Sequence, residues 1–180
     1  ILLEEAVKQK VDFVLGISTD KAAQVSGVYG ASKLLMERLF TQFEKTYPDI
    51  MFRIVRYGNV LYSTGSVLCI WKNLIKQGKE VIVTEPKATR FFWNVEQAID
   101  LIFDCFHNAK DSTPYCPDMK SMRIDDLLQA MVVKYGDGKE IPIKVIGLQP
   151  GENLHEKVLE EGLASNEVEH FTVEEIMELI

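Results

Sequence analysis

The stretch Phe13–Lys33, FVLGISTDKAAQVSGVYGASK, decides the fold. It begins within the apolar run Val11–Ile17, which is short and rich in β-branched residues, as in a parallel strand buried on both faces. Polar residues follow this run at once, and after a loop of small residues Tyr29 opens an amphipathic segment. Because ligands of open α/β sheets bind outside the carboxyl ends of the strands, the sequence predicts a functional site here.

Outward from this stretch, expected strands and helices alternate, which favours an α/β fold. The helix opened by Tyr29 is expected over 28–46, because Pro48 cannot continue it. Further strands are expected at 51–56, 81–84 and 141–146, with an extended piece at 113–117 and a loop at 85–93. Further helices are expected at 67–77, 96–108, 124–135, 154–160 and 173–179, and residues 1–10 read as the end of a helix already under way.

The composition is that of an ordinary globular protein, with 47% hydrophobic and 26% charged residues in 180. A net charge of -7 without a run of lysines or arginines argues against a nucleic-acid partner. The 3 cysteines lack CxxC spacing and favour a reducing, cytoplasmic location, and the scattered histidines predict no metal site. No membrane helix or signal segment is recognisable in this part of the protein.

Tyr29 and Lys33 stand four residues apart, which places both on one face of the expected helix. A nearby ammonium stabilises a phenolate, the form in which tyrosine accepts a proton. The same spacing recurs at Tyr135 and Lys139, but the residues between them, Gly-Asp-Gly, predict a turn. Spacing alone is therefore a weak signal, and the polar strand end at Thr19–Lys21 is what distinguishes the first pair. The plainer interpretation is an ordinary aromatic residue beside a solvated charge.

Several ordered motifs resemble the carboxyl-terminal half of the nucleotide-sugar dehydratases, which are extended short-chain dehydrogenases/reductases. They are STDKAA at 18–23, YGASK at 29–33, RYGNV at 56–60, TRF at 89–91 and PGENLHE at 150–156. The nearest group is that of the UDP-N-acetylglucosamine 4,6-dehydratases, the CapD-like proteins of polysaccharide biosynthesis. Lys21 distinguishes this group from the dTDP-glucose 4,6-dehydratases, which carry a glutamate there.

The resemblance implies a Rossmann-like NAD(P)-binding fold with a small substrate-binding subdomain. Residues 1–84 would form the second half of the Rossmann-like sheet with the catalytic residues. Residues 85–180 would form mostly the substrate-binding subdomain and the C-terminal helices, in one partial domain. The fingerprint GxxGxxG that cradles a dinucleotide pyrophosphate is absent, so we expect the amino-terminal dinucleotide-binding half to lie outside these residues. The 180 residues alone should then bind NADP poorly and expose a sheet edge.

The resemblance also implies a reaction, in which an NADP- or NAD-dependent enzyme converts UDP-N-acetylglucosamine into a 4-keto-6-deoxy sugar nucleotide. Tyr29 would take the proton of the 4-hydroxyl while hydride leaves to the cofactor, and Thr19 would hydrogen-bond the same hydroxyl. Lys33 would hold the nicotinamide ribose. Lys21 would remove the proton from carbon 5 and Asp20 would protonate the departing 6-hydroxyl, after which hydride returns to carbon 6. The alternative for Lys21 and Asp20 is a surface ion pair.

Further binding residues follow from the same resemblance. Four residues that follow the second strand would line the nicotinamide and the sugar, namely Tyr57, Gly58, Asn59 and Val60. Among them, the Asn59 amide would contact the substrate. Ser66 and Val67 open a helix whose N-terminus suits a diphosphate. Arg90 would reach the nucleotide or its phosphates unless it is a solvated loop arginine. Glu152 would lie near the nucleotide, and His155 could equally be a structural histidine.

Three positions depart from the family pattern. Thr64 and Gln149 stand where arginines are usual, which bears on diphosphate binding, and Tyr62 replaces a usual glycine. Two other functions therefore stay in competition with dehydration. One is 4-epimerisation or reduction of a nucleotide sugar, for which Tyr29 and Lys33 suffice. The other is a catalytically silent interaction module that pairs through the helix 28–46, the same surface through which an active form would make a homo-oligomer.

Overall fold

The computed structural model describes all 180 residues. The helices are α1 (Leu2–Lys8), α2 (Val28–Thr46), α3 (Val67–Lys76), α4 (Val95–Asn108), α5 (Ile124–Tyr135) and α6 (Val173–Leu179), with a short 3-10 helix η1 (Asp20–Ala22). The strands are β1 (Phe13–Thr19), β2 (Met51–Tyr57), β3 (Asn59–Val60), β4 (Val81–Val83), β5 (Thr89–Arg90), β6 (Phe92–Trp93), β7 (Pro114–Tyr115), β8 (Met122–Arg123) and β9 (Ile143–Val145).

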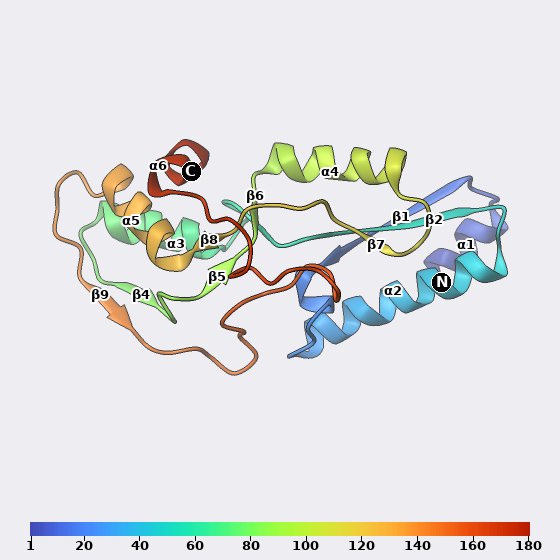
Figure 1. Cartoon of the computed structure of the whole chain (residues 1–180), viewed down its shortest axis with the longest axis horizontal. Helices are drawn as coiled ribbons and strands as arrows, with labels where there is room; N and C mark the ends of the chain where they lie inside the picture. Colours follow the sequence, from blue (N-terminus) through green and yellow to red (C-terminus); the bar gives the residue numbers. More distant parts are fainter. The chain divides into compact units, whose positions relative to one another are not determined.

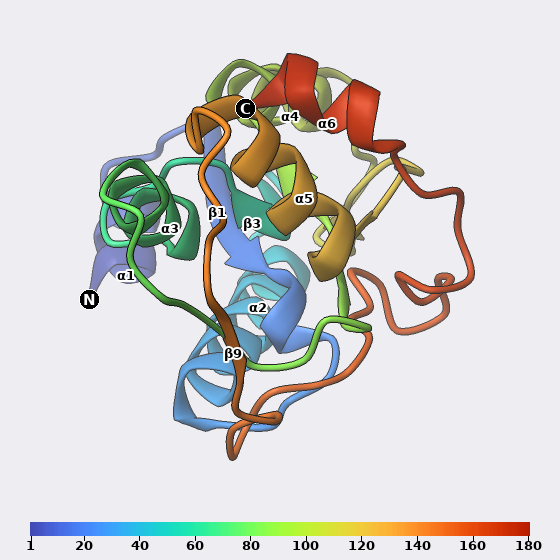
Figure 2. The same ribbon diagram turned by 90° about the vertical axis from the view of Figure 1, so that its left-hand side faces the viewer.

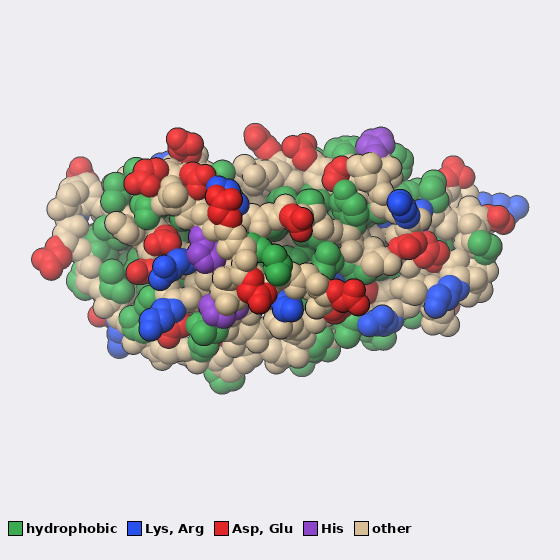
Figure 3. All heavy atoms as spheres, viewed as in Figure 1, with side chains coloured by type: hydrophobic (Ala, Val, Ile, Leu, Met, Phe, Trp, Pro, Cys, Tyr) green, Lys and Arg blue, Asp and Glu red, His purple; other side chains and the backbone are tan.

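These elements form two compact units. The first comprises Ile1–Gly58, Glu96–Asp118 and Lys157–Gly162. The second comprises Asn59–Val95, Met119–Glu156 and Leu163–Ile180. No helix has the length and apolar character needed to cross a membrane. Acidic and basic side chains are interspersed over the surface shown in Figure 3.

A parallel three-stranded sheet in the order β1-β2-β7 forms the centre of the first unit. Helices α2 and α4 lie on its opposite faces (Figure 1). The parallel arrangement of β1 is confirmed, and so is the expected sheet edge, because β1 pairs with β2 alone. The prediction that this strand is buried on both faces is wrong, since its first three residues, Phe13–Leu15, are only half-buried and Ile17 is exposed at the edge.

The core of the first unit lies between α2 and the sheet. The ring of Phe40 on α2 lies so close to Gly16 that a Cβ there would meet it at 2.9 Å, which explains a glycine inside the strand. Phe40 packs with Ile50, Phe52 and Ile54, and half-buried residues complete the cluster. The predicted helix 28–46 is confirmed at both ends.

The second unit contains three strand pairs, the parallel pairs β3-β6 and β4-β9 and the antiparallel pair β5-β8. Helix α5 packs against both α3 and α6 (Figure 2). The core of the second unit is an apolar cluster that includes Leu68, Trp71, Ile75, Leu127, Met131 and Ile176. The strand pairs are short, so this cluster between helices and strands supplies most of the unit's buried apolar surface.

Two expected elements are wrong. The predicted helix 154–160 does not form, because its backbone carbonyls serve tertiary contacts: Leu154 accepts from the backbone N–H of Thr89, and Val158 accepts from Arg56. In an α-helix these carbonyl oxygens would instead accept hydrogen bonds from backbone N–H groups four residues later. The expected loop at 85–93 instead contains β5 and β6. The remaining predicted helices are confirmed to within one residue at each end, apart from the segment 1–10, where α1 covers Leu2–Lys8.

Candidate active site

The carboxyl end of β1 carries a buried carboxylate with two neighbours as partners. The side chain of Asp20 has no solvent exposure, whereas that of Lys21 is 42% exposed. Thr19 Oγ1 donates to Asp20 Oδ1 at 2.8 Å, and Lys21 Nζ lies 3.1 Å from the same oxygen. The ion pair predicted as the alternative is therefore present, but it is not a surface pair. A buried carboxylate is costly unless it is paired and hydrogen-bonded, and both conditions are met.

Gly30 brings the first turn of α2 against this group. A Cβ at Gly30 would lie only 2.2 Å from the carbonyl oxygen of Lys21, so any side chain here would push the helix away from η1. This contact fixes the first turn of α2, which carries Tyr29, against η1. Sequence reasoning missed this role of Gly30, although the motif YGASK contains the glycine that signals it.

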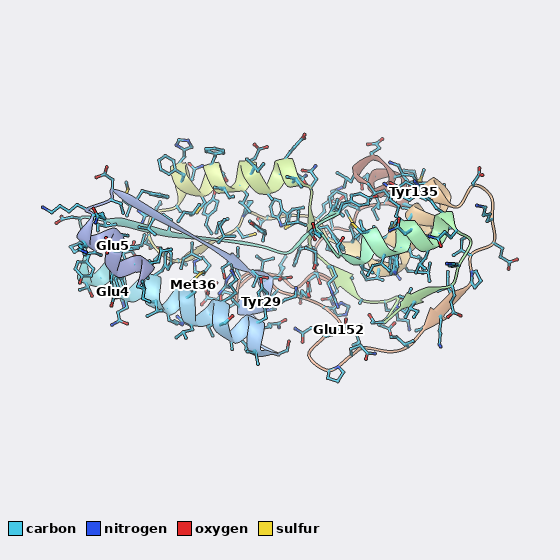
Figure 4. The ribbon with its side chains drawn as sticks, turned by 180° about the vertical axis from the view of Figure 1, so that it is seen from behind. Glu4, Glu5, Tyr29, Met36, Tyr135 and Glu152 are labelled. Carbon is cyan, nitrogen blue, oxygen red and sulfur yellow. The ribbon has the colours of Figure 1, made fainter.

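Tyr29 and Lys33 lie on one face of α2, as predicted. Lys33 Nζ is 6.0 Å from the centre of the Tyr29 ring, and it donates to the carbonyl oxygen of Ile17 at 3.0 Å. Tyr29 is 56% exposed at the start of the helix (Figure 4). Its phenol is therefore accessible to a ligand, while Lys33 is tied to β1.

The end of β2 lies directly beside the end of β1. Thr19 and Tyr57 are register partners in the parallel pair, and Gly58 follows. Burial raises the pKa of Tyr57, and the neighbouring Tyr29 adds to this effect. The first unit thus brings together seven predicted site residues, namely Thr19, Asp20, Lys21, Tyr29, Lys33, Tyr57 and Gly58.

The other predicted site residues belong to the second unit. The backbone N–H and the side-chain amide of Asn59 both donate to the carbonyl oxygen of Phe91, at 2.8 and 3.2 Å, and Val60 pairs with β6. Ser66 is the residue before the first turn of α3, and its side chain makes no capping bond to the helix. Val67 begins the helix.

Arg90 is not a solvated loop arginine. Its side chain is only 12% exposed, with Nε 3.3 Å from Glu156 Oε1 and Nη1 donating to the carbonyl oxygen of Leu154 at 3.0 Å. Glu152 is exposed (Figure 4), and its carboxylate accepts from the backbone N–H of Gln149 at 3.0 Å. The Arg90 guanidinium is thus held in place, whereas the Glu152 carboxylate forms a hydrogen bond within an exposed turn.

His155 has a structural partner, in agreement with the plainer of the two expectations. Its Nδ1 lies 2.8 Å from Thr89 Oγ1, and burial, followed by the nearby Arg90 and His170, lowers its pKa. The Thr89 hydroxyl also lies 2.6 Å from Ser165 Oγ. Sequence reasoning missed this network because its members come from distant segments with no common pattern.

The side chain of Tyr62, a position where the resemblance leads us to expect a glycine, is directed toward α5. Its backbone keeps the left-handed conformation typical of glycine, with a φ of 57°. Its hydroxyl lies 2.8 Å from that of Tyr135, and Lys72 Nζ lies 5.0 and 4.7 Å from the two ring centres. Burial, and then the bond to Tyr135, raises the pKa of Tyr62.

Comparisons with known proteins place the chain in a family. The model of the family described as "Polysaccharide biosynthesis protein" matches residues 1–178. The chain is 36% identical over 158 residues to the capsular polysaccharide biosynthesis protein CapD of Staphylococcus aureus, covering 87% of this chain and 26% of CapD. It is 31% identical over 176 residues to the UDP-N-acetylglucosamine 4,6-dehydratase (inverting) of Campylobacter jejuni, covering 96% of this chain. It is 32% identical over 160 residues to the UDP-glucose 4-epimerase of Rickettsia akari, covering 88% of this chain.

The chain spans about half the length of the last two relatives, 49% of the dehydratase and 46% of the epimerase. Among solved structures, Pen from Bacillus thuringiensis matches with a TM-score of 0.89 and 28% identity, over 99% of this chain and 64% of Pen. TunA, an NAD-dependent NDP-hexosamine 5,6-dehydratase, matches with a TM-score of 0.72 and 17% identity, over 99% of this chain and 65% of TunA. The chain therefore belongs to the polysaccharide biosynthesis family of CapD and the UDP-N-acetylglucosamine 4,6-dehydratases, and it has part of the Rossmann-like fold of the extended short-chain dehydrogenases/reductases.

Proposed function

We propose that the natural protein is a nucleotide-sugar 4,6-dehydratase that acts on UDP-N-acetylglucosamine. The observation that supports this function is the buried Asp20 carboxylate, which contacts both Thr19 and Lys21 beside the start of α2. Loss of water from a sugar needs a base at carbon 5 and an acid at the 6-hydroxyl. We assign these two roles to Lys21 and Asp20, which lie against the first turn of α2.

Each step is assigned to a side chain with a suitable position. The exposed phenol of Tyr29 accepts the proton of the 4-hydroxyl, and Thr19 orients that hydroxyl. Lys21, as the neutral amine, removes the proton from carbon 5, and Asp20, as the neutral acid, protonates the departing 6-hydroxyl. Lys21 would return its proton to carbon 5 once carbon 6 is reduced. The proton that Tyr29 took from the 4-hydroxyl would replace the one that Asp20 gave to the departing water, so all three groups are restored.

The residues at the ends of β1 and β2 fit the nicotinamide end of a dinucleotide. Lys33 has three ammonium donors, of which one bonds Ile17, so the side chain is oriented and still able to hold a ribose hydroxyl. Tyr57 and Gly58, with Asn59 and Val60, would line the nicotinamide. NADP or NAD supplies reversible hydride transfer when bound, and the NAD dependence described for TunA supports this choice.

Substrate binding is assigned to residues of the second unit. Asn59 would contact the sugar, Ser66 and Val67 would bind the diphosphate at the N-terminus of α3, and Glu152 would lie near the nucleotide. Arg90 would bind a phosphate, with Glu156 holding its guanidinium in position.

Analysis of the product by mass spectrometry and NMR tests this function. The natural protein at its full length is incubated with UDP-N-acetylglucosamine, and we expect loss of one water and a 4-keto-6-deoxy product. Lys21→Ala should abolish the product, whereas the control Lys139→Ala should retain it, because Lys139 follows a turn and bonds the carbonyl of Lys76. An unchanged sugar in a panel of nucleotide sugars would contradict the proposal and favour the silent interaction module.

The Rickettsia relative supports 4-epimerisation as a second candidate. In that reaction Tyr29 and Lys33 suffice, and Asp20 and Lys21 have no chemical role. The epimerase would give a product of unchanged mass with the 4-hydroxyl inverted, and it would keep its activity in Lys21→Ala. The two candidate functions therefore differ in the product they give and in the activity expected of Lys21→Ala.

We further propose that α2 pairs two copies of the protein. The helix leaves a stripe of apolar side chains exposed, among them Val28, Leu35 and Leu39. Exposed apolar residues aligned on one side of a helix are typical of an interface. Sedimentation of a Leu35→Glu, Leu39→Glu double variant tests this, and an unchanged mass for variant and natural protein would contradict it.

A further inference from the structure

A buried charged network joins three segments of the first unit. Arg56, near the end of β2, has no solvent exposure, and Glu37 on α2 is also buried. Arg56 Nε donates to Glu37 Oε1 at 2.7 Å and Nη2 donates to Oε2 at 2.5 Å. Ser18, the residue before Thr19, donates its hydroxyl to Glu37 Oε1 at 2.5 Å. One carboxylate thus connects α2 to the ends of both β1 and β2.

A second carboxylate closes the network from a distant part of the chain. Arg56 Nη1 donates to Glu160 Oε2 at 2.8 Å and to the carbonyl oxygen of Val158 at 2.9 Å, and Nη2 donates to Glu160 Oε1 at 2.9 Å. The segment Lys157–Gly162 belongs to the first unit, although the residues before and after it belong to the second. Burial alone would lower the pKa of Arg56, but the hydrogen bonds to Glu37 and Glu160 outweigh it and raise this pKa.

The network fixes α2 against β1 at the point where the proposed catalytic groups meet. Glu37 follows Lys33 by one helical turn, and the two side chains contact consecutive residues of β1. Lys33 bonds the carbonyl of Ile17, and Glu37 accepts from the hydroxyl of Ser18. The close approach of Gly30 to η1 provides a third contact, one turn earlier. A slip of α2 along β1 would break all three contacts.

We propose that Glu37 and Arg56, completed by Ser18 and Glu160, are positioning residues that set the register of α2 against the end of β1. This register holds Lys33 at the carbonyl of Ile17 and the first turn of α2, which carries Tyr29, against η1. The positioning role therefore rests on the proposed function. A buried ion pair is by itself weak evidence for stability, because apolar residues of similar volume often serve as well. The two parallel hydrogen bonds between Arg56 and Glu37 instead fix the relative orientation of β2 and α2, which apolar packing alone does not.

The chain contains a matched control pair. Arg53 on β2 contacts Glu44 on α2, with Nη1 2.9 Å from Oε1. This pair joins the same two elements as Arg56 and Glu37, but its hydrogen bonds lead to the segment around Ser112 and not to β1. Loss of the Arg53 pair should therefore affect stability without changing the register at the proposed site.

The first measurement is steady-state kinetics of the natural full-length protein and three variants. Ser18→Ala and Arg56→Lys should each lower kcat about 10- to 100-fold, because small misplacements of reacting groups are costly. KM should stay within about threefold, since neither side chain is assigned to the substrate. Arg53→Lys should leave kcat unchanged. Equal losses of kcat in Arg53→Lys and Arg56→Lys would overturn the proposal.

Amide hydrogen exchange supplies a readout that does not depend on activity. The amides of residues 31–35 in α2 should exchange about tenfold faster in Ser18→Ala than in Arg53→Lys, because a loosened register opens this turn. If the natural protein converts no nucleotide sugar, the proposed function fails, and the exchange rates still decide the register. Equal rates in the two variants would overturn the positioning role. Glu160→Gln, at a side chain that is 49% exposed, replaces Arg56→Lys if that variant does not fold, with the same results expected.

Discussion

Lys33 Nζ donates a hydrogen bond to the carbonyl oxygen of Ile17 at 3.0 Å. The acceptor belongs to β1, the edge strand of the sheet, and the donor belongs to the helix that carries Tyr29. The ammonium therefore has a fixed direction before any ligand binds. This fixed direction reduces the conformational entropy that ligand binding would otherwise cost.

Lys33→Met should remove most of the activity of the natural protein. Loss of a group that supports proton transfer typically lowers the rate about 100- to 10,000-fold, and we expect kcat to fall within this range. Lys33→Arg should retain part of the activity, because it keeps the charge but not the compact ammonium. Product formation measured over time checks this, and a Lys33→Met variant with natural kcat would contradict the role.

Gly30→Ser should damage both stability and activity. A Cβ at Gly30 meets the Lys21 carbonyl oxygen at 2.2 Å, and overpacking of this kind costs about 1–3 kcal/mol of unfolding free energy. The matched control is Gly27→Ser. No atom lies within 4 Å of a Cβ at Gly27, which precedes the first turn of α2, where serine is a favoured residue. Urea unfolding measures both free energies, and equal stability of the two variants would argue against the close contact.

The ion pair between Arg56 and Glu160 should make stability depend on pH in acid. A hydrogen bond from Arg56 lowers the pKa of Glu160 below its ordinary value of 4.5. The unfolded chain therefore binds this proton more readily, so the contribution is present above pH 4.5 and is lost as pH falls through the lower, folded pKa. Glu160→Gln should flatten this part of the curve.

Thermal unfolding between pH 3 and pH 7 follows this dependence, with Glu161→Gln, at an exposed neighbour, as the control. We expect the control to keep the slope of the natural protein. A Glu160→Gln variant with the same acid dependence as the natural protein would show that the pair contributes nothing.

The 180 residues expressed alone should not bind NADP tightly. They carry no GxxGxxG fingerprint, and a dinucleotide pyrophosphate depends on such a loop at a helix N-terminus. Titration calorimetry with NADP checks this expectation, with the natural full-length protein measured for comparison. Tight binding or dehydratase activity by the 180 residues alone would contradict it.

Local pattern made much of this protein predictable from its sequence. The helix 28–46 was predictable at both ends because its apolar residues repeat with the helical period and Pro48 cannot continue it. The strand end with Thr19–Lys21 and the pair Tyr29 and Lys33 stood out because their residue types and spacing fit proton transfer. The family follows from the same ordered motifs.

Contacts between distant residues were decided only by the tertiary structure. Arg56 and Glu160 are 104 residues apart in sequence, and no periodic signal links them. Residues 154–160 have the composition of a helix, yet they form bends and a turn. The carbonyl oxygens of Leu154 and Val158 accept hydrogen bonds from Thr89 and Arg56 instead of from a helical turn. A sequence alone determines structure where neighbouring residues supply the hydrogen-bond partners, and the tertiary structure decides where the partners come from elsewhere in the chain.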